Sequence, residues 1–424
     1  MNEPRRAVRP LPPLHRLRPR AYYGWTIAVA LCVQSSVVMG VGFYGIAVLL
    51  SALCDAHGWS RAEVSLATSL YFFAGGPASL LAGRLVDGLG ARACMAAGAL
   101  VMALALVLVG RVELPGQLLF AYPLLSLGTS FAGGVPSNAL VTRWFTAKRA
   151  RAMSIAHTGV SIGGVVLVPL ATHLILREGL EAATRWLAAL LLATVLPTVL
   201  LVLRASPEEH GLEVDGDARA AEATRLVGFE SQRRLWTPGE VLRAPAFWVL
   251  AAGFGGILFC QLGVAMHQIS LLRDRLGPET AALALSTSAF GSFASRLVVG
   301  SFADRVGKRG LALGLVLLQS SAYLAFAFAE GAPLLLLASL VFGFAIGNLF
   351  MLQPLLVGEL FGIPSFATVL GLLQLLTQTL SGLGPLALGQ LAAGFGSYAP
   401  GLLVLLGVAL AAALVLYAGG RLRG

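Results

Sequence analysis

The chain has 424 residues, of which 57% are hydrophobic and only 12% are charged. Because about a quarter of the residues in a soluble domain are charged, this composition excludes an ordinary soluble protein and predicts a surface that mostly faces lipid. The net charge of +10 does not indicate nucleic-acid binding, since the 30 basic residues fall in short segments between apolar runs, a distribution typical of membrane topology.

The amino-terminal segment, residues 1–23, is basic and rich in proline and leads directly into an apolar run of spanning length. We therefore expect a disordered cytoplasmic tail and not a cleaved signal peptide. A membrane-spanning helix needs about 20 mostly apolar residues. The sequence predicts twelve such spans, at 24–53, 62–83, 92–111, 116–141, 152–176, 185–203, 246–272, 280–301, 309–329, 332–357, 366–393 and 398–419.

One long polar segment, residues 204–245, divides these spans six and six. The predicted domains are therefore an N-terminal six-helix bundle at 24–203, a cytoplasmic linker at 204–245 and a C-terminal six-helix bundle at 246–420. Basic residues concentrate in the amino-terminal tail, in "TRWFTAKRARA" and in "GGRLRG". Because cytoplasmic loops hold the excess of Lys and Arg, we expect both termini in the cytoplasm and a multi-pass protein of the plasma or inner membrane.

An internal repeat defines the architecture. The stretch "GRLVDGLGAR" at 83–92 and the stretch "GSFADRVGKR" at 300–309 each lie between the second and third span of their half. Gly83, Asp87, Gly90 and Arg92 match Gly300, Asp304, Gly307 and Arg309 at one constant spacing along the chain, which we call the repeat offset. We therefore predict an all-α membrane protein whose twelve transmembrane helices form two pseudo-symmetric bundles of six.

This duplicated loop in a chain of six plus six spans resembles the major facilitator superfamily. Further stretches are similar to its monocarboxylate and oxalate–formate transporter branch, namely "YYGWTIAVA", "HGWSRAEVSLATSL", "RWFTAKRARAMSIAHTGVSIGG", "SPEEHGLEVDGD" and "LRAPAFWVLAAGFG". The resemblance implies a secondary transporter that works by alternating access, with no cofactor and no enzymatic activity.

Arg296 is the one formal charge that falls clearly inside a predicted span, and no carboxylate is placed to pair with it there. Asp304 is eight residues further on, about 12 Å along a helix. In one interpretation Arg296 faces a water-filled path and binds an anionic substrate through its planar fork of donors. In the other it extends to the cytoplasmic interface as a structural residue. The resemblance favours the first, because this branch binds the substrate carboxylate with an arginine eight residues before the loop aspartate.

The chain also departs from that branch. Proton-linked animal members have an aspartate where Ser292 stands and a lysine near Phe43 and Tyr44, and oxalate-type members have a second cation near Thr377. A single fixed positive charge favours a monocarboxylate over a dianion. We expect Asn138, Gln378 and Tyr44 to contribute to substrate binding beside Arg296, although interhelical hydrogen bonds are an alternative role for such polar groups.

The duplicated loops have a mechanical interpretation. Asp87 and Asp304 lie where a carboxylate can face the positively polarised start of a neighbouring helix and the adjacent arginines Arg92, Arg305 and Arg309. Such contacts would latch the cytoplasmic side shut and break when the halves rock. The alternative is that the loops only determine topology.

His267, late in the seventh span, is the proton-coupling candidate, because histidine titrates near neutrality and no acidic group lies at that depth. A packed histidine with satisfied ring nitrogens is the alternative.

The pattern Gly-x-Ser-x-Gly at 159–163 fits a hydrolase nucleophile, but it lies inside an apolar span, where Gly159 and Gly163 indicate helix packing. The sequence therefore predicts a monomeric transporter of a small organic anion, a monocarboxylate, with a co-transported proton left open and with no nucleic acid, metal or cofactor. An exporter of amphipathic compounds and a non-transporting membrane sensor remain as alternatives.

Overall fold

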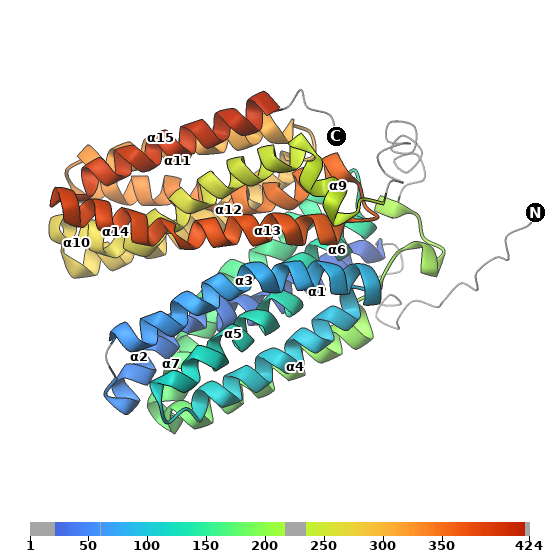
Figure 1. Ribbon diagram of the computed structural model, residues 1–424. Coiled ribbons are helices and arrows are strands. Elements are labelled where there is room, and N and C mark those ends of the chain that lie inside the picture. Colours follow the sequence, from blue (N-terminus) through green and yellow to red (C-terminus); the bar gives the residue numbers. More distant parts are fainter. Residues whose placement is uncertain (1–21, 60, 217–234, 420–424) are drawn as a thin grey trace, which may run out of the picture.

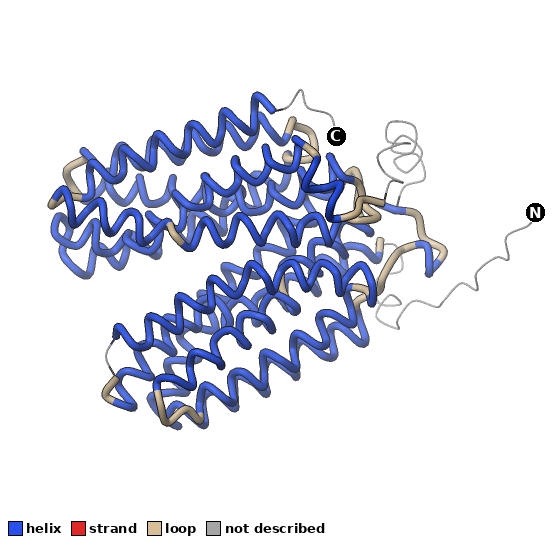
Figure 2. The backbone as a smooth tube through the Cα atoms, viewed as in Figure 1, coloured by secondary structure: helices blue, strands red, loops and turns tan. Residues whose placement is uncertain are grey.

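The computed structural model describes residues 22–59, 61–216 and 235–419, and all regular structure in these ranges is helical (Figure 2). The expected tail at 1–23 and the middle of the linker therefore lie almost entirely outside the described residues. The elements are α1 (Tyr23–Met39), η2 (Gly40–Tyr44), α2 (Gly45–His57), α3 (Arg61–Leu89), α4 (Ala91–Gly110), α5 (Pro115–Ala132), α6 (Gly134–Trp144), α7 (Arg149–Pro197), η3 (Thr198–Val202), η4 (Glu208–His210), η5 (Val214–Gly216), α9 (Pro238–Arg243), α10 (Pro245–Phe302), α11 (Lys308–Phe328), α12 (Ala332–Phe361), α13 (Phe366–Gly382), α14 (Gly384–Phe395) and α15 (Tyr398–Ala418).

Eleven helical stretches in the described ranges are long and apolar enough to cross a membrane. One of them, at 149–202, has 54 residues and is interrupted at Gly179, where φ is 78°. Gly277 interrupts α10 in the same way, with φ at 76°. Only glycine adopts this conformation without steric cost, so the chain reverses at both positions. The long stretch thus supplies two spans, and the predicted twelve-helix membrane fold is confirmed.

The spans form two bundles that lie side by side (Figure 1). Helices α1–α7 build the first bundle and α10–α15 build the second, and the two converge at the end where α6 and α9 lie. Across the boundary α3 packs along α13, and the second part of α10 packs along the first part of α7. These two pairs are related by the internal repeat, because α3 and the second part of α10 each end within one of the two matched stretches.

Within the first bundle, α1 and α7 approach closely over two glycines. A Cβ built on Gly159 would lie 2.0 Å from the carbonyl oxygen of Cys32, and one built on Gly163 would lie 2.2 Å from that of Ser36. Small residues allow such contact between membrane helices. The "GVSIG" stretch is therefore a packing surface, in agreement with the sequence interpretation.

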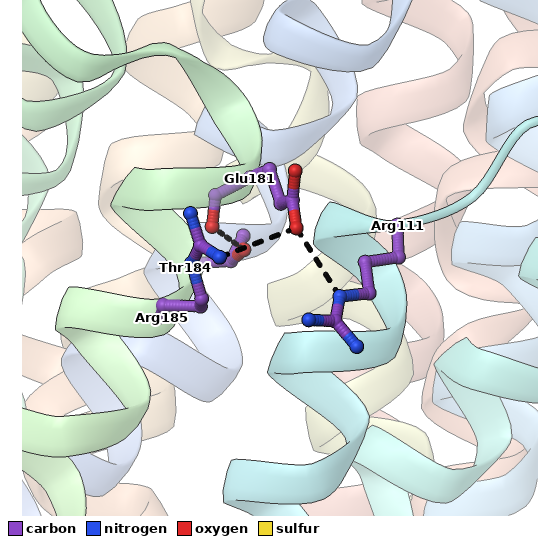
Figure 3. Close-up of polar contacts among 4 residues, drawn as sticks. All are labelled: Arg111, Glu181, Thr184 and Arg185. Atoms are coloured by element: carbon purple, nitrogen blue, oxygen red, sulfur yellow. Dashed lines mark hydrogen bonds and ion pairs between the residues drawn. The ribbon is translucent and has the colours of Figure 1, made fainter.

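At the opposite end from α6 and α9, a cluster of ion pairs joins the end of α4 to the second part of α7 (Figure 3). The Glu181 Oε1 atom lies 3.2 Å from Arg111 Nε and 3.4 Å from Arg185 Nη1. All three side chains are about half exposed or more, so each pair contributes about 0–1 kcal/mol. The cluster stays within one bundle and does not join the two halves.

Gly159→Ala is expected to destabilise the protein by about 1–3 kcal/mol, because the added methyl group overpacks the α1–α7 contact. Thermal unfolding of the purified protein in detergent measures the change. Gly314→Ala in α11 is the matched control, since a Cβ there meets nothing within 4 Å and alanine is the better helix former. Equal melting temperatures for the two variants would contradict this account of the packing.

Candidate substrate site and contacts between the bundles

Arg296 lies in the second part of α10 and is only 6% exposed. Its Nε atom donates a hydrogen bond to the carbonyl oxygen of Gly347 in α12, at 3.1 Å. Its Nη1 atom donates to the hydroxyl oxygen of Ser161 in α7. Gly347 belongs to the same bundle and Ser161 to the other, so the guanidinium bridges the two halves instead of extending to the membrane interface.

This cation has no acidic partner within the part of the chain that the structure describes. The ion pairs there join Glu181 to Arg111 and Arg185, and Lys308 to Glu359, and none includes Arg296. A guanidinium has five N–H donors, of which two are used by Gly347 and Ser161. For the remaining donors of Arg296, the described ranges show no hydrogen-bond partner.

Polar residues of the first bundle surround this position. Tyr44, at the end of η2, packs over Gly164, where a Cβ would lie 3.1 Å from the tyrosine ring, and Gly164 follows Ser161 by three residues on α7. His157 precedes Ser161 by one helical turn on the same face of α7. Its Nε2 atom donates to Asn138 Oδ1 in α6 at 2.9 Å. The structure thus brings Tyr44 and Asn138 to the same part of the bundle boundary as Arg296.

Gln378 lies elsewhere on the boundary. Its Nε2 atom donates to the hydroxyl oxygen of Ser79 in α3, at 3.2 Å. The repeat offset separates Gln378 from Ser161, and it also separates Arg296 from Ser79. The Gln378–Ser79 contact is therefore the pseudo-symmetric counterpart of the Arg296–Ser161 contact, with a neutral pair in place of the charged one.

His267, in the first part of α10, contacts the segment where the chain passes from α13 to α14. Its Nε2 atom lies 3.0 Å from the carbonyl oxygen of Pro385 and its Nδ1 atom lies 3.1 Å from the hydroxyl oxygen of Tyr398. Pro385 follows the interruption between α13 and α14. A carbonyl only accepts, so Nε2 donates, whereas a tyrosine hydroxyl can either donate to Nδ1 or accept from it. A second proton on the ring therefore costs no hydrogen bond.

Both loop aspartates reach across the bundle boundary. Asp304 Oδ1 accepts from the Ala150 amide at 2.6 Å and Oδ2 accepts from the Arg151 amide at 3.1 Å, at the start of α7. Asp87 Oδ2 accepts from the Thr368 amide at the start of α13, at 2.9 Å. Arg151 and Thr368 are again separated by the repeat offset, so the two contacts are pseudo-symmetric. Following the orientation and the role that the sequence predicts, we name these two contacts together the cytoplasmic gate.

The environment of Asp304 combines opposing effects. Burial raises the pKa of its carboxyl group above the ordinary value, while the amides of Ala150 and Arg151 and the charge of Lys308 act to lower it. A carboxylate at this position therefore depends on the start of α7 for its stabilisation.

The predicted arginine partners of the gate differ in their placement. Arg92 donates to the carbonyl oxygens of Val199 and Leu200 at the end of the sixth span, both at 3.1 Å. Arg305 is exposed and Arg309 is half-buried, and no side-chain hydrogen bond is described for either. Arg149, which sequence reasoning did not single out, is 8% exposed at the start of α7 and donates through Nε to the carbonyl oxygen of Phe145. Its basic neighbours in "AKRAR" gave no signal that this one alone would be buried.

Comparison with known proteins assigns the chain to a family. Residues 32–277, more than half of the chain, match the model of the Major Facilitator Superfamily. The chain belongs to the major facilitator superfamily. Members of the superfamily are transporters and not enzymes, and the chain is an integral multi-pass membrane protein.

Curated members of the superfamily are similar to the chain at low identity. The oxalate:formate antiporter of Oxalobacter formigenes is 26% identical over 287 residues, which cover 67% of this chain and 64% of that protein. The chain thus spans slightly less than two thirds of that relative. Monocarboxylate transporter 13 of Rattus norvegicus is 27% identical over 394 residues, which cover 91% of this chain and 86% of that protein.

Solved structures of the superfamily share the fold. The human organic anion transporter MFSD10 superposes with a TM-score of 0.69 at 18% identity, covering 93% of this chain and 99% of that chain. The fucose:proton symporter of E. coli superposes with a TM-score of 0.68 at 16% identity, covering 95% and 99%. At these identities the likeness concerns the fold alone.

Proposed function

We propose that the protein is a secondary transporter that moves a small organic anion, a monocarboxylate, by alternating access, with Arg296 as the substrate anchor. The observation that supports this most is a guanidinium buried between the two halves without an acidic partner in the described ranges. A buried charge is costly unless it is paired. The cargo supplies the missing negative charge.

The boundary favours one carboxylate over two. At the position related to Arg296 by the repeat stands neutral Ser79, which is bound by Gln378. Thr377, near which the oxalate-type members have a second cation, accepts a hydrogen bond from Gln353 Nε2 at 3.0 Å. One end of the proposed cargo is therefore charged and binds Arg296, whereas any group near Gln378 and Ser79 meets neutral donors and acceptors. The two similar proteins named above, an oxalate:formate antiporter and a monocarboxylate transporter, support an organic anion.

Arg296→Lys keeps the charge but loses the planar fork, so the KM for the transported anion is expected to rise about tenfold or more, since one hydrogen bond to a charged group is worth about 1.5–3 kcal/mol. Arg296→Ala should abolish saturable uptake. The assay is uptake of labelled lactate, pyruvate and formate into proteoliposomes.

Arg273→Lys, an exposed arginine of α10, is the matched control and should transport as the parent does. Unchanged KM in both Arg296 variants, with the melting temperature retained, would refute the anchor and favour an exporter of amphipathic compounds in which Arg296 is structural.

The cytoplasmic gate is proposed as the latch of this transporter. Each aspartate accepts amide hydrogen bonds from a helix start in the opposite half, so any separation of the halves at this end must break them. With both termini in the cytoplasm, as the distribution of basic residues predicts, the structure corresponds to the outward-facing state.

Asp304→Asn removes the charge that the start of α7 stabilises and should increase the inward-facing fraction about tenfold. Spin labels at Leu89→Cys and Gly310→Cys, on opposite halves at the gate end, report the separation by double electron–electron resonance. The background replaces Cys32, Cys54, Cys94 and Cys260. A distance distribution identical to that of the parent would argue against a latch.

His267 is proposed as the proton-coupling residue. Both of its partners can accept a hydrogen bond from a doubly protonated ring, and Pro385 lies at the break between α13 and α14. Because α13 also contains Gln378 and the gate residue Thr368, a change of charge at His267 acts on the helix that links the site to the gate.

His267→Gln cannot titrate but can still donate to Pro385, so proton-driven accumulation should be lost while anion exchange persists. The measurement is lactate accumulation under an imposed pH gradient, with a pH-sensitive dye in the lumen. His173→Gln, an exposed histidine of the fifth span, should accumulate lactate as the parent does. Proton-driven accumulation in His267→Gln equal to that of the parent would assign coupling elsewhere.

A further inference from the structure

Asp215 is an unusual residue within the linker between the bundles. It is 2% exposed, whereas Glu213, two positions earlier, is exposed. Its backbone has φ of 59°, the one positive value at a non-glycine residue in the described ranges. Such a conformation is unfavourable for a residue with a Cβ, so the surrounding contacts must stabilise it.

The carboxylate of Asp215 supplies those contacts. Its Oδ2 atom accepts from the amides of Thr146 at 3.0 Å and Ala147 at 2.7 Å, and its Oδ1 atom accepts from the amide of Lys148 at 3.1 Å. Lys148 Nζ also donates to the Asp215 carbonyl oxygen at 3.5 Å. These three amides immediately precede α7, which begins at Arg149. The linker therefore fixes the turn from which α7 starts.

The same helix start receives the gate carboxylate. The first amides of an α-helix have no partner within the helix, and in α7 two of them donate to Asp304, while the amides just before the helix donate to Asp215. Asp215 binds the amides of residues 146–148 and Asp304 binds those of Ala150 and Arg151. Every partner of Asp215 in this cluster lies in the first bundle, so its contacts persist when the halves separate, while those of Asp304 break.

The other end of the linker contacts the turn before α13, which the internal repeat relates to the turn before α7. The Trp236 amide donates to the hydroxyl oxygen of Ser365, directly before α13, at 2.9 Å. The Trp236 ring packs edge-on against the Phe361 ring, with 5.2 Å between the ring centroids. Ser365 is the counterpart of Lys148 at the repeat offset, and α13 is the helix whose start receives Asp87. Each end of the linker thus holds one of the two helix starts to which the gate aspartates bind.

We infer that the linker is part of the gating mechanism and that Asp215 is a positioning residue, which holds the amides at the start of α7 in the geometry that Asp304 recognises. This inference rests on the proposed latch. It assigns to the linker a control over the equilibrium between outward-facing and inward-facing states, in addition to joining the bundles.

The experiment uses the full chain with the same spin labels at positions 89 and 310. Asp215→Asn is expected to raise the ratio of inward-facing to outward-facing protein several-fold, towards the about tenfold change expected for Asp304→Asn. In the double variant the two effects should not add, because both act on one contact. Glu213→Gln, the exposed acid of the same segment, is the matched control and should leave the distance distribution unchanged.

Three results overturn the inference. If Asp304→Asn opens the gate and Asp215→Asn does not, the linker has no part in gating and the latch stands. If neither variant changes the distances, the latch fails and the inference fails with it, while the Arg296 uptake assay still tests transport separately. If the effects of Asp215→Asn and Asp304→Asn on the ratio add fully, Asp215 acts on the equilibrium independently of the Asp304 contact and is not its positioning residue.

Discussion

A guanidinium enclosed by apolar helices, with no acidic partner among the described residues, is the constraint around which this molecule is organised. Arginine does not escape the cost of burial by losing its proton, so the charge at Arg296 must be compensated by dipoles or by an ion that is not part of the chain. Gly347 and Ser161 provide two dipoles, one from each half. They hold the side chain in place but do not neutralise it, which leaves the boundary between the bundles positively charged.

The internal duplication explains how this asymmetry is built on a symmetric frame. One gate contact repeats in both halves, since Asp304 with Arg151 and Asp87 with Thr368 are related by the repeat offset, while Asp304 also binds the Ala150 amide. The boundary contacts at the site repeat in position but not in chemistry, because Arg296 with Ser161 corresponds to Ser79 with Gln378. The two halves thus share the aspartate contacts at the gate, whereas only the C-terminal half has a buried charge, Arg296, at the boundary.

The sequence was sufficient for the features that depend on local pattern. Apolar runs and the duplicated loop predicted twelve spans in two bundles, and the depth of Arg296 in its span marked it without any knowledge of its neighbours. Features that depend on pairing between distant segments were out of reach. The burial of Asp215 depends on amides 67 to 69 residues away, and in the sequence it was one acid among several in a polar linker. Arg149 and the His157–Asn138 contact were hidden for the same reason.

The continuity of two helices has a thermodynamic consequence. Arg296 lies in α10 and Asp304 follows its last residue, while Ser161 and the amides bound by Asp304 share α7. The same two helices, α7 and α10, therefore carry the contacts between the bundles both at Arg296 and at the gate. Arg296 and Asp304 are about 12 Å apart along the direction of α10. Coupling between two such equilibria is reciprocal. If the proposed anion stabilises the closed state of the proposed gate by a given free energy, closing the gate strengthens binding of that anion by the same free energy.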